Sequence, residues 1–247
     1  MVNWLVASGK WLVVLLFLIQ AGFAASGGNA FHAKKYFEQG RYEAAYNQYL
    51  LALKEAKKEA DLVAEGRILI SMATLANHAM QYEESAKLLD LVRVNTLDET
   101  SKESFYRTYM EFYNLQSKYK EAFEIAKKNS SKKPSAAFCG EAAIAAAGSK
   151  NSSEADAYLK KINKSDSPGQ LAFYSAKVAD LNGEKPRELY ENALRISTEK
   201  KQFFISGLIL LRLAEITGNK DYAARSAAVF GELGLAKPFQ KAEEAAK

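Results

Sequence analysis

Residues 30–58 read AFHAKKYFEQGRYEAAYNQYLLALKEAKK, and this stretch decides the fold. Apolar residues recur three, four and seven positions apart on both sides of Gly40, so the pattern predicts two amphipathic helices joined by a tight turn. One face of the second helix combines small and aromatic residues: Tyr42, Ala45, Tyr49, Ala52 and Leu53. A hairpin of this kind cannot bury its apolar face alone, so we expect it to stack on similar neighbours.

Weaker copies of the segment after the turn recur along the chain. Each of the first three has a tyrosine followed three residues later by a small side chain: RYEAA at 41–45, QYEES at 81–85 and KYKEA at 118–122. A fourth copy, SSEA at 152–155, has lost the tyrosine, and GNKDYA at 218–223 regains a glycine and a tyrosine. Between these two, Tyr190–Ile196 resembles a second helix and follows a turn at Asn182–Pro186.

These features resemble the tetratricopeptide repeat family, whose unit is about 34 residues long. In the first unit the matching residues are Ala33 and Tyr36 of the first helix, Gly40 of the turn, and Ala45, Tyr49 and Ala52 of the second helix. The resemblance implies an all-α fold, a right-handed superhelical solenoid of about six helical hairpins. We expect the hairpins at residues 29–62, 66–97, 101–130, 135–163, 168–198 and 202–235, with a C-terminal cap at 236–247.

The first residues have a different character from the rest. Lys10 precedes the apolar run Trp11–Ile19, and the small residues Ala24 and Ala25 follow. This order predicts a secretory signal peptide at residues 1–25, ahead of a solenoid at 26–247, because the run is shorter than the roughly 20 residues that span a membrane. We therefore expect an exported protein, periplasmic or secreted. An uncleaved signal anchor in the inner membrane is the alternative.

The resemblance also implies a binding surface, since first helices line a concave groove in that family. Carried onto this sequence, the partner-binding positions are Lys34, Phe37, Glu38, Arg67, Thr74, Asn77, His78, Arg107, Glu111, Asn114, Arg212 and Glu215. The equivalent positions of the fourth unit are Gly140, Ile144, Ala147 and Gly148, which predict an apolar wall there. Such a mixture of amides, hydroxyls and charges suits a peptide segment bound through hydrogen bonds.

No catalytic constellation is found in the sequence. Nucleophile elbows, zinc-binding helices, phosphate-binding glycine loops and paired cysteines are missing, and His32 and His78 have no second ligand at metal-binding spacing. We therefore expect no enzyme activity, no cofactor and no metal. The single cysteine, Cys139, is expected to be buried. The net charge of +5 comes from interspersed charges, so nucleic acid is not an expected partner.

The sequence therefore predicts a non-catalytic scaffold of the cell envelope that binds a protein or peptide in its groove. The first alternative is a self-associating assembly factor, which exposed apolar residues on second helices would favour. The second is a carbohydrate-binding module, or an enzyme of unrecognised type, that uses the aromatic cluster between Phe105 and Tyr113. Contact with a membrane is expected only through an uncleaved anchor, and the oligomeric state stays open.

Overall fold

The structure, a computed structural model, describes residues 28–131, 133–163 and 168–246. Within these ranges every regular element is a helix, which confirms the predicted all-α class. The chain is helical at residues 28–38 and then forms α2 (Tyr42–Glu59), α3 (Leu62–His78), α4 (Tyr82–Asp90), the short η1 (Val94–Thr96), α5 (Glu99–Leu115), α6 (Tyr119–Asn129), α7 (Ala136–Gly148), α8 (Ser152–Lys160), α9 (Pro168–Leu181), α10 (Arg187–Glu199), α11 (Phe203–Thr217), α12 (Lys220–Glu232) and α13 (Ala236–Ala246).

The turn inside each helix pair contains a residue in the left-handed backbone conformation. These residues have φ between 54° and 80°: Gly40, Met80, Ser117, Lys150, Gly183 and Gly218. In the first five turns the next residue donates its N–H to the carbonyl five positions back, at 2.8–3.0 Å. This bond satisfies a carbonyl group that the helix end leaves without an intrahelical partner. The same turn therefore recurs even where the sequence offers no glycine.

The second to fifth pairs pack on one another through their first helices, whereas α2 packs on α3 and α10 on α11. α3 contacts α5, α5 contacts α7, and α7 contacts α9, while each second helix packs on the first helix of its own pair. Small residues in this row admit aromatic rings from the next helix, because a Cβ atom built on Gly140 of α7 would lie 2.0–2.3 Å from three ring carbons of Tyr174 of α9. The helices can therefore approach more closely than larger side chains would allow.

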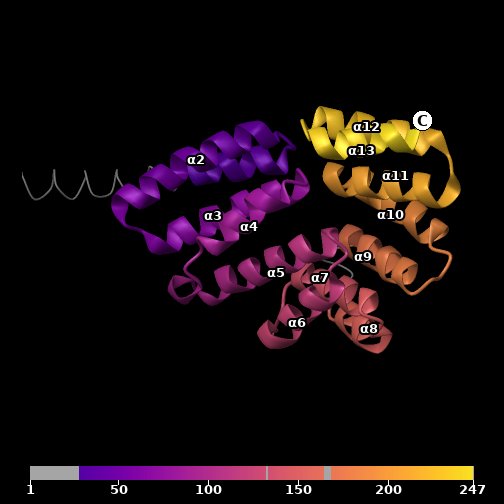
Figure 1. The fold of residues 1–247 in the computed structure, drawn as a ribbon, viewed down its shortest axis with the longest axis horizontal. Helices are drawn as coiled ribbons and strands as arrows, with labels where there is room; N and C mark the ends of the chain where they lie inside the picture. Colours follow the sequence, from indigo (N-terminus) through magenta and orange to yellow (C-terminus); the bar gives the residue numbers. More distant parts are fainter. Residues whose placement is uncertain (1–27, 132, 164–167, 247) are drawn as a thin grey trace, which may run out of the picture.

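The two ends of the array lie against each other, and Figure 1 shows α11–α13 returning toward the first two pairs. The His78 ring at the end of α3 stacks on Phe204 at the start of α11, with ring centroids 3.7 Å apart and planes 8° from parallel. Lys237 Nζ of α13 donates to the Met80 carbonyl at 3.3 Å. One hydrophobic core includes both ends, with Leu75 and Phe230 among its members. We name this contact the end seam, and the sequence pattern did not predict it.

The predicted signal peptide at residues 1–25 lies outside the described residues. Among the residues that the structure describes, no helix has the length and apolar character needed to span a bilayer. At the other end, α13 buries Pro238 and Ala242 against the core and exposes most of its charged side chains.

Two glycine substitutions test the packing of the helix row. Gly140→Ala places a methyl group inside the buried Tyr174 ring, so we expect the free energy of unfolding to fall by about 2 kcal/mol. Gly231→Ala in α12 meets only Phe239 at 3.4–3.6 Å, an ordinary contact. There the higher helix propensity of alanine should raise stability by up to about 1 kcal/mol. Urea unfolding followed by circular dichroism measures both, and equal stability of the Gly140→Ala variant and wild type would contradict the packing.

Candidate functional site

Buried and half-buried polar side chains connect the first helices across α3, α5, α7 and α9, and we name them the first-helix network. Its members are Thr74, Asn77, His78, Arg107, Thr108, Glu111, Asn114, Glu141 and Tyr174. The α3 and α5 members lie three or four residues apart within their helix, so each helix presents them on one face. The network therefore runs along the row of helix contacts and not across the outer surface.

Glu111 of α5 is the centre of the first half of the network. His78 Nε2 lies 3.2 Å from Glu111 Oε1, and Asn77 Nδ2 donates to Oε2 at 3.3 Å. The other ring nitrogen of His78 lies 3.0 Å from the Tyr42 hydroxyl of α2. The Arg107 guanidinium lies 3.7 Å from Glu111 Oε2, so the buried carboxylate faces a cation, an amide and a histidine.

Hydroxyl groups complete this half of the network. Arg107 Nη2 donates to Thr108 Oγ1 at 3.1 Å and to Thr74 Oγ1 at 3.3 Å, and the two threonine oxygens lie 3.1 Å apart. Thr74 is on α3 and Thr108 on α5, so these bonds connect the two helices. Arg107 is thus held in one geometry, since its charged group has defined partners on both helices.

Glu141 of α7 is the centre of the second half. Asn114 Nδ2 of α5 donates to Glu141 Oε2 and to its backbone carbonyl, both at 2.9 Å. The Tyr174 hydroxyl of α9 donates to Glu141 Oε1 at 3.3 Å. One carboxyl group therefore joins three successive helices.

The two buried carboxyl groups have opposite pKa shifts. Burial opposes ionisation of Glu111, but hydrogen bonds from His78 and Asn77 and the charge of Arg107 outweigh it and hold the pKa of Glu111 below its ordinary value. For Glu141, burial and the nearby charge of Glu111 raise the pKa. Two close carboxylates in a low-dielectric setting cannot both ionise easily, so the network favours one charged and one neutral carboxyl group.

Two amide oxygens in the network have no hydrogen-bond partner among the described residues. They are Oδ1 of Asn77 and Oδ1 of Asn114, and both atoms are buried. Each Asn uses its NH₂ group as donor and leaves its acceptor unpaired, which costs roughly 1–3 kcal/mol for a buried group. Both atoms are inaccessible from the surface, so only a donor as small as a water molecule suits them.

A second polar cluster joins α9, α10 and α11. The Arg212 guanidinium donates two hydrogen bonds of 2.7 Å to the carboxylate of Asp180, which also accepts from the Tyr190 hydroxyl at 3.0 Å. Arg212 Nη1 bonds Glu215 at 2.8 Å. Burial opposes the charge on Asp180, but these bonds hold its pKa below the ordinary value. Burial lowers the pKa of Lys177, which lies nearby on α9.

The structure brings eight of the predicted groove residues into these two clusters. Thr74, Asn77, His78, Arg107, Glu111 and Asn114 belong to the first-helix network, and Arg212 and Glu215 to the second cluster. Four of them, Thr74, Asn77, Glu111 and Asn114, are buried and bonded to neighbouring helices. Lys34 and Glu38 pair with each other on the surface, Arg67 is exposed and pairs with Asp98, and Phe37 lies beside the His78 ring.

Sequence reasoning missed Glu141, Tyr174 and Asp180. The four positions named for the fourth unit carry no polar side chain, and the polar member of α7 is Glu141, one position after Gly140. A carboxylate inside the otherwise apolar run 136–148 was the signal available in the sequence.

Other candidate groups have packing roles. Phe105 and Phe112 are buried, and the rings between Phe105 and Tyr113 meet edge to face or tilted, as packed aromatic residues do. Cys139 is fully buried, and burial raises the pKa of its thiol to about 11. In the described part of the chain, no group of three or more His, Cys, Asp or Glu side chains is arranged to hold a metal ion.

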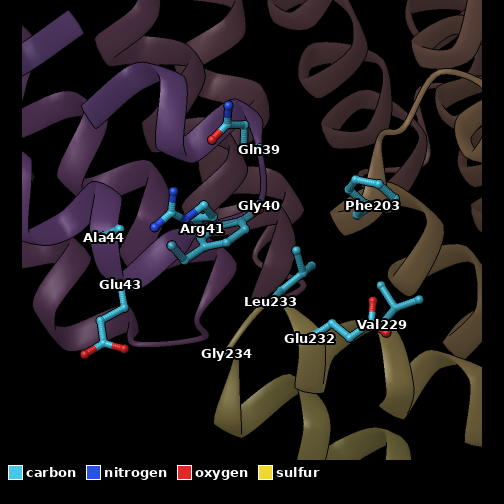
Figure 2. A pocket seen from close by; sticks show the side chains of 11 residues that line it. Gln39, Gly40, Arg41, Glu43, Ala44, Phe203, Val229, Glu232, Leu233 and Gly234 are labelled. Atoms are coloured by element: carbon cyan, nitrogen blue, oxygen red, sulfur yellow. The ribbon is translucent and has the colours of Figure 1, made fainter. Parts of the chain in front are cut away.

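Two hollows open at the end seam. The first, of about 390 Å³, lies between the turn at residues 39–44 and the C-terminal helices, and Figure 2 shows Gly40 facing Leu233, with Phe203 and Val229 beyond. The second, of about 930 Å³, lies between α2, the turn at 79–81, α4 and the start of α13. We name it the tyrosine hollow, because Tyr42, Tyr46 and Tyr82 line it.

Comparisons with known proteins identify no family for the chain. No protein-family model matches the chain, and no curated protein has significant similarity to it.

Glu141→Gln tests the electrostatics of the network. A carboxyl group whose pKa rises on folding contributes stability at low pH that is lost as the pH rises from its ordinary pKa of 4.5 toward about 7. Glutamine has no such charge, so the stability of the variant relative to wild type should increase between about pH 4.5 and about pH 7 and then stay constant. Urea unfolding across this range measures the difference, and a difference independent of pH would contradict the raised pKa.

Proposed function

We propose that the protein is a non-catalytic scaffold that binds a protein or peptide along its row of first helices, and that the array is a right-handed solenoid of the tetratricopeptide type. The recurring turn and the spacing of the repeated segments support this architecture. The charged start, short apolar run and small residues of the N-terminal segment support export to the cell envelope.

The observation that carries the binding role is the polar character of the first helices, where charged side chains of several pairs are exposed beside the buried network. Helix stacking alone does not require a buried polar network, because apolar residues of similar volume stabilise a core at least as well as a buried ion pair. The oxygens of Asn77 and Asn114 lie on successive helices and accept no bond from a described residue. Neither oxygen is accessible, so a bound segment contacts the exposed charged side chains of the same row of helices instead.

Three first helices also carry cations with accessible side chains, outside the buried part of the network. Lys34 and Arg67 have side chains that are 71% and 59% exposed, and Arg212 is 35% exposed. They lie on first helices of different pairs, so a bound segment can contact several units of the array.

Self-association is a second candidate, because second helices expose apolar residues. Leu50 and Leu51 of α2 are 43% and 49% exposed, and Leu189 of α10 is 43% exposed. A single exposed apolar side chain such as Leu189 is common on monomers. Leu50 and Leu51 are adjacent on one helix, so together they offer a larger apolar contact to a second copy. A molecular mass that rises with concentration distinguishes this candidate from the scaffold proposal.

A matched pair of variants tests the scaffold proposal. Peptides selected from a random library on the wild-type protein should bind the Lys34→Ala, Arg67→Ala double variant at least about fivefold more weakly, since truncated interface cations commonly reduce affinity by this much. The control is Arg187→Ala with Arg195→Ala on α10, which removes two exposed cations of a second helix. Calorimetric titration measures both, and selected peptides that bind both variants as tightly as wild type would contradict a site on the first helices.

A further inference from the structure

The tyrosine hollow has features that the scaffold proposal does not use. It is formed by both ends of the array, since α2 and α4 supply one side and residues 234–237 the other. Glu43 and Gly234 line both this hollow and the smaller one in Figure 2. Leu75, Ala76 and Leu235 supply apolar lining, so the hollow combines apolar, aromatic and charged groups.

Carboxylates without partners surround this hollow. Glu43, Glu83 and Glu84 form no ion pair with a described residue. Two ammonium groups also line the hollow: Lys237, which donates to the Met80 carbonyl, and Lys87, which is exposed one turn beyond Glu83. The negative groups therefore exceed the positive ones, although the chain as a whole is basic.

The rings of Tyr46 and Tyr82 in the hollow are not covered by a described cation, and Tyr82 meets Phe112 edge to face. Elsewhere in the protein its own cations cover aromatic rings, as Arg41 covers Tyr36 at 4.5 Å and Lys161 covers Tyr158 at 4.8 Å. Among the described residues no cation covers Tyr46 or Tyr82, and both rings are half-buried. Burial, with Glu84 nearby, raises the pKa of Tyr46, so its ring stays neutral and keeps the negative face that attracts cations.

We propose that the tyrosine hollow binds an arginine-bearing segment of a partner protein. A guanidinium group stacks on a tyrosine face and donates to carboxylates with its remaining N–H groups, so it matches Tyr46 and Tyr82 beside Glu83 and Glu84. Arginine fits better than lysine because its planar fork donates two parallel N–H bonds to one carboxylate while its face stacks on a ring. The inference assumes a protein partner, as the scaffold proposal does, but it places the contact on a different surface.

Because both ends of the array form the hollow, a segment bound there contacts α4 and α13 together. Binding therefore favours the arrangement in which the ends are in contact, since a ligand stabilises the state that it binds.

A labelled peptide of alternating arginine and glycine tests this inference on the purified full chain. We expect the peptide to bind the wild type, and a glutamate–glycine peptide of the same length not to bind. Glu83→Gln with Glu84→Gln should weaken binding of the arginine peptide by roughly fivefold or more, because it removes two charge-assisted contacts. The control, Glu154→Gln with Asp156→Asn on α8, neutralises two exposed carboxylates of another second helix and should bind as wild type. Fluorescence anisotropy gives the affinities.

Three results would overturn the inference. The first is that the wild type shows no preference for the arginine peptide, and the second is that the α8 control loses affinity equally. The third is a dimer in sedimentation that Glu83→Gln with Glu84→Gln abolishes, because a second copy would then be the occupant. The Lys34→Ala, Arg67→Ala variant should bind the arginine peptide as wild type does. Failure of the first-helix site and failure of the tyrosine hollow are thus separate outcomes.

Discussion

The contact between the two ends of the helix array determines much of this structure. Each helix pair needs a neighbour to cover its apolar face, and in an open array the first and last pairs expose theirs. Here α11–α13 bury Phe230 and Leu235 in the same core as Leu75 of the second pair. The His78–Phe204 stack adds a contact between α3 and α11, which are far apart in the sequence. Closure thus covers apolar surface at both ends and creates the two hollows at the seam.

The first-helix network lies beside the end seam, and it is held by hydrogen bonds and charge, whereas the seam is held mainly by apolar packing. Its bonds connect α3 to α5, α5 to α7 and α7 to α9, so each helix is fixed against the next by directional contacts. Hydrophobic packing alone tolerates sliding, whereas a buried polar group that loses its partner is costly. His78 belongs to both systems, because its ring nitrogens bond Tyr42 and Glu111 while its face stacks on Phe204. The polar network and the end seam are therefore coupled at one residue.

Local pattern was sufficient to predict the all-helical class, because the spacing of apolar residues reports helix faces directly. It was less informative about the turns, since Met80, Ser117 and Lys150 adopt the conformation that glycine favours and leave no glycine to recognise. It could not predict the end seam, where Lys237 meets Met80 from 157 residues away, because no periodic feature encodes such a contact.

Only part of the candidate site was predictable from the sequence. Asn77, Glu111 and Asn114 were found by aligning first helices, but the bonds from Asn77 to Glu111 and from Asn114 to Glu141 depend on the distance between helices, which the sequence does not give. Glu141 was missed because it occupies the position equivalent to Thr108, 33 residues earlier, and that position was not among those carried over from the family. The tyrosine hollow could not be seen at all, since its two sides come from opposite ends of the chain.

The central claim is that the ends of the array are in contact in solution. It is tested most directly by the distance between spin labels at Glu43→Cys and Glu232→Cys, placed in a Cys139→Ala background. Both positions line the hollow at the end seam, on opposite sides of it. The account predicts one narrow distribution at the short end of the measurable range. A broad distribution centred at long distances would show an open array and contradict it.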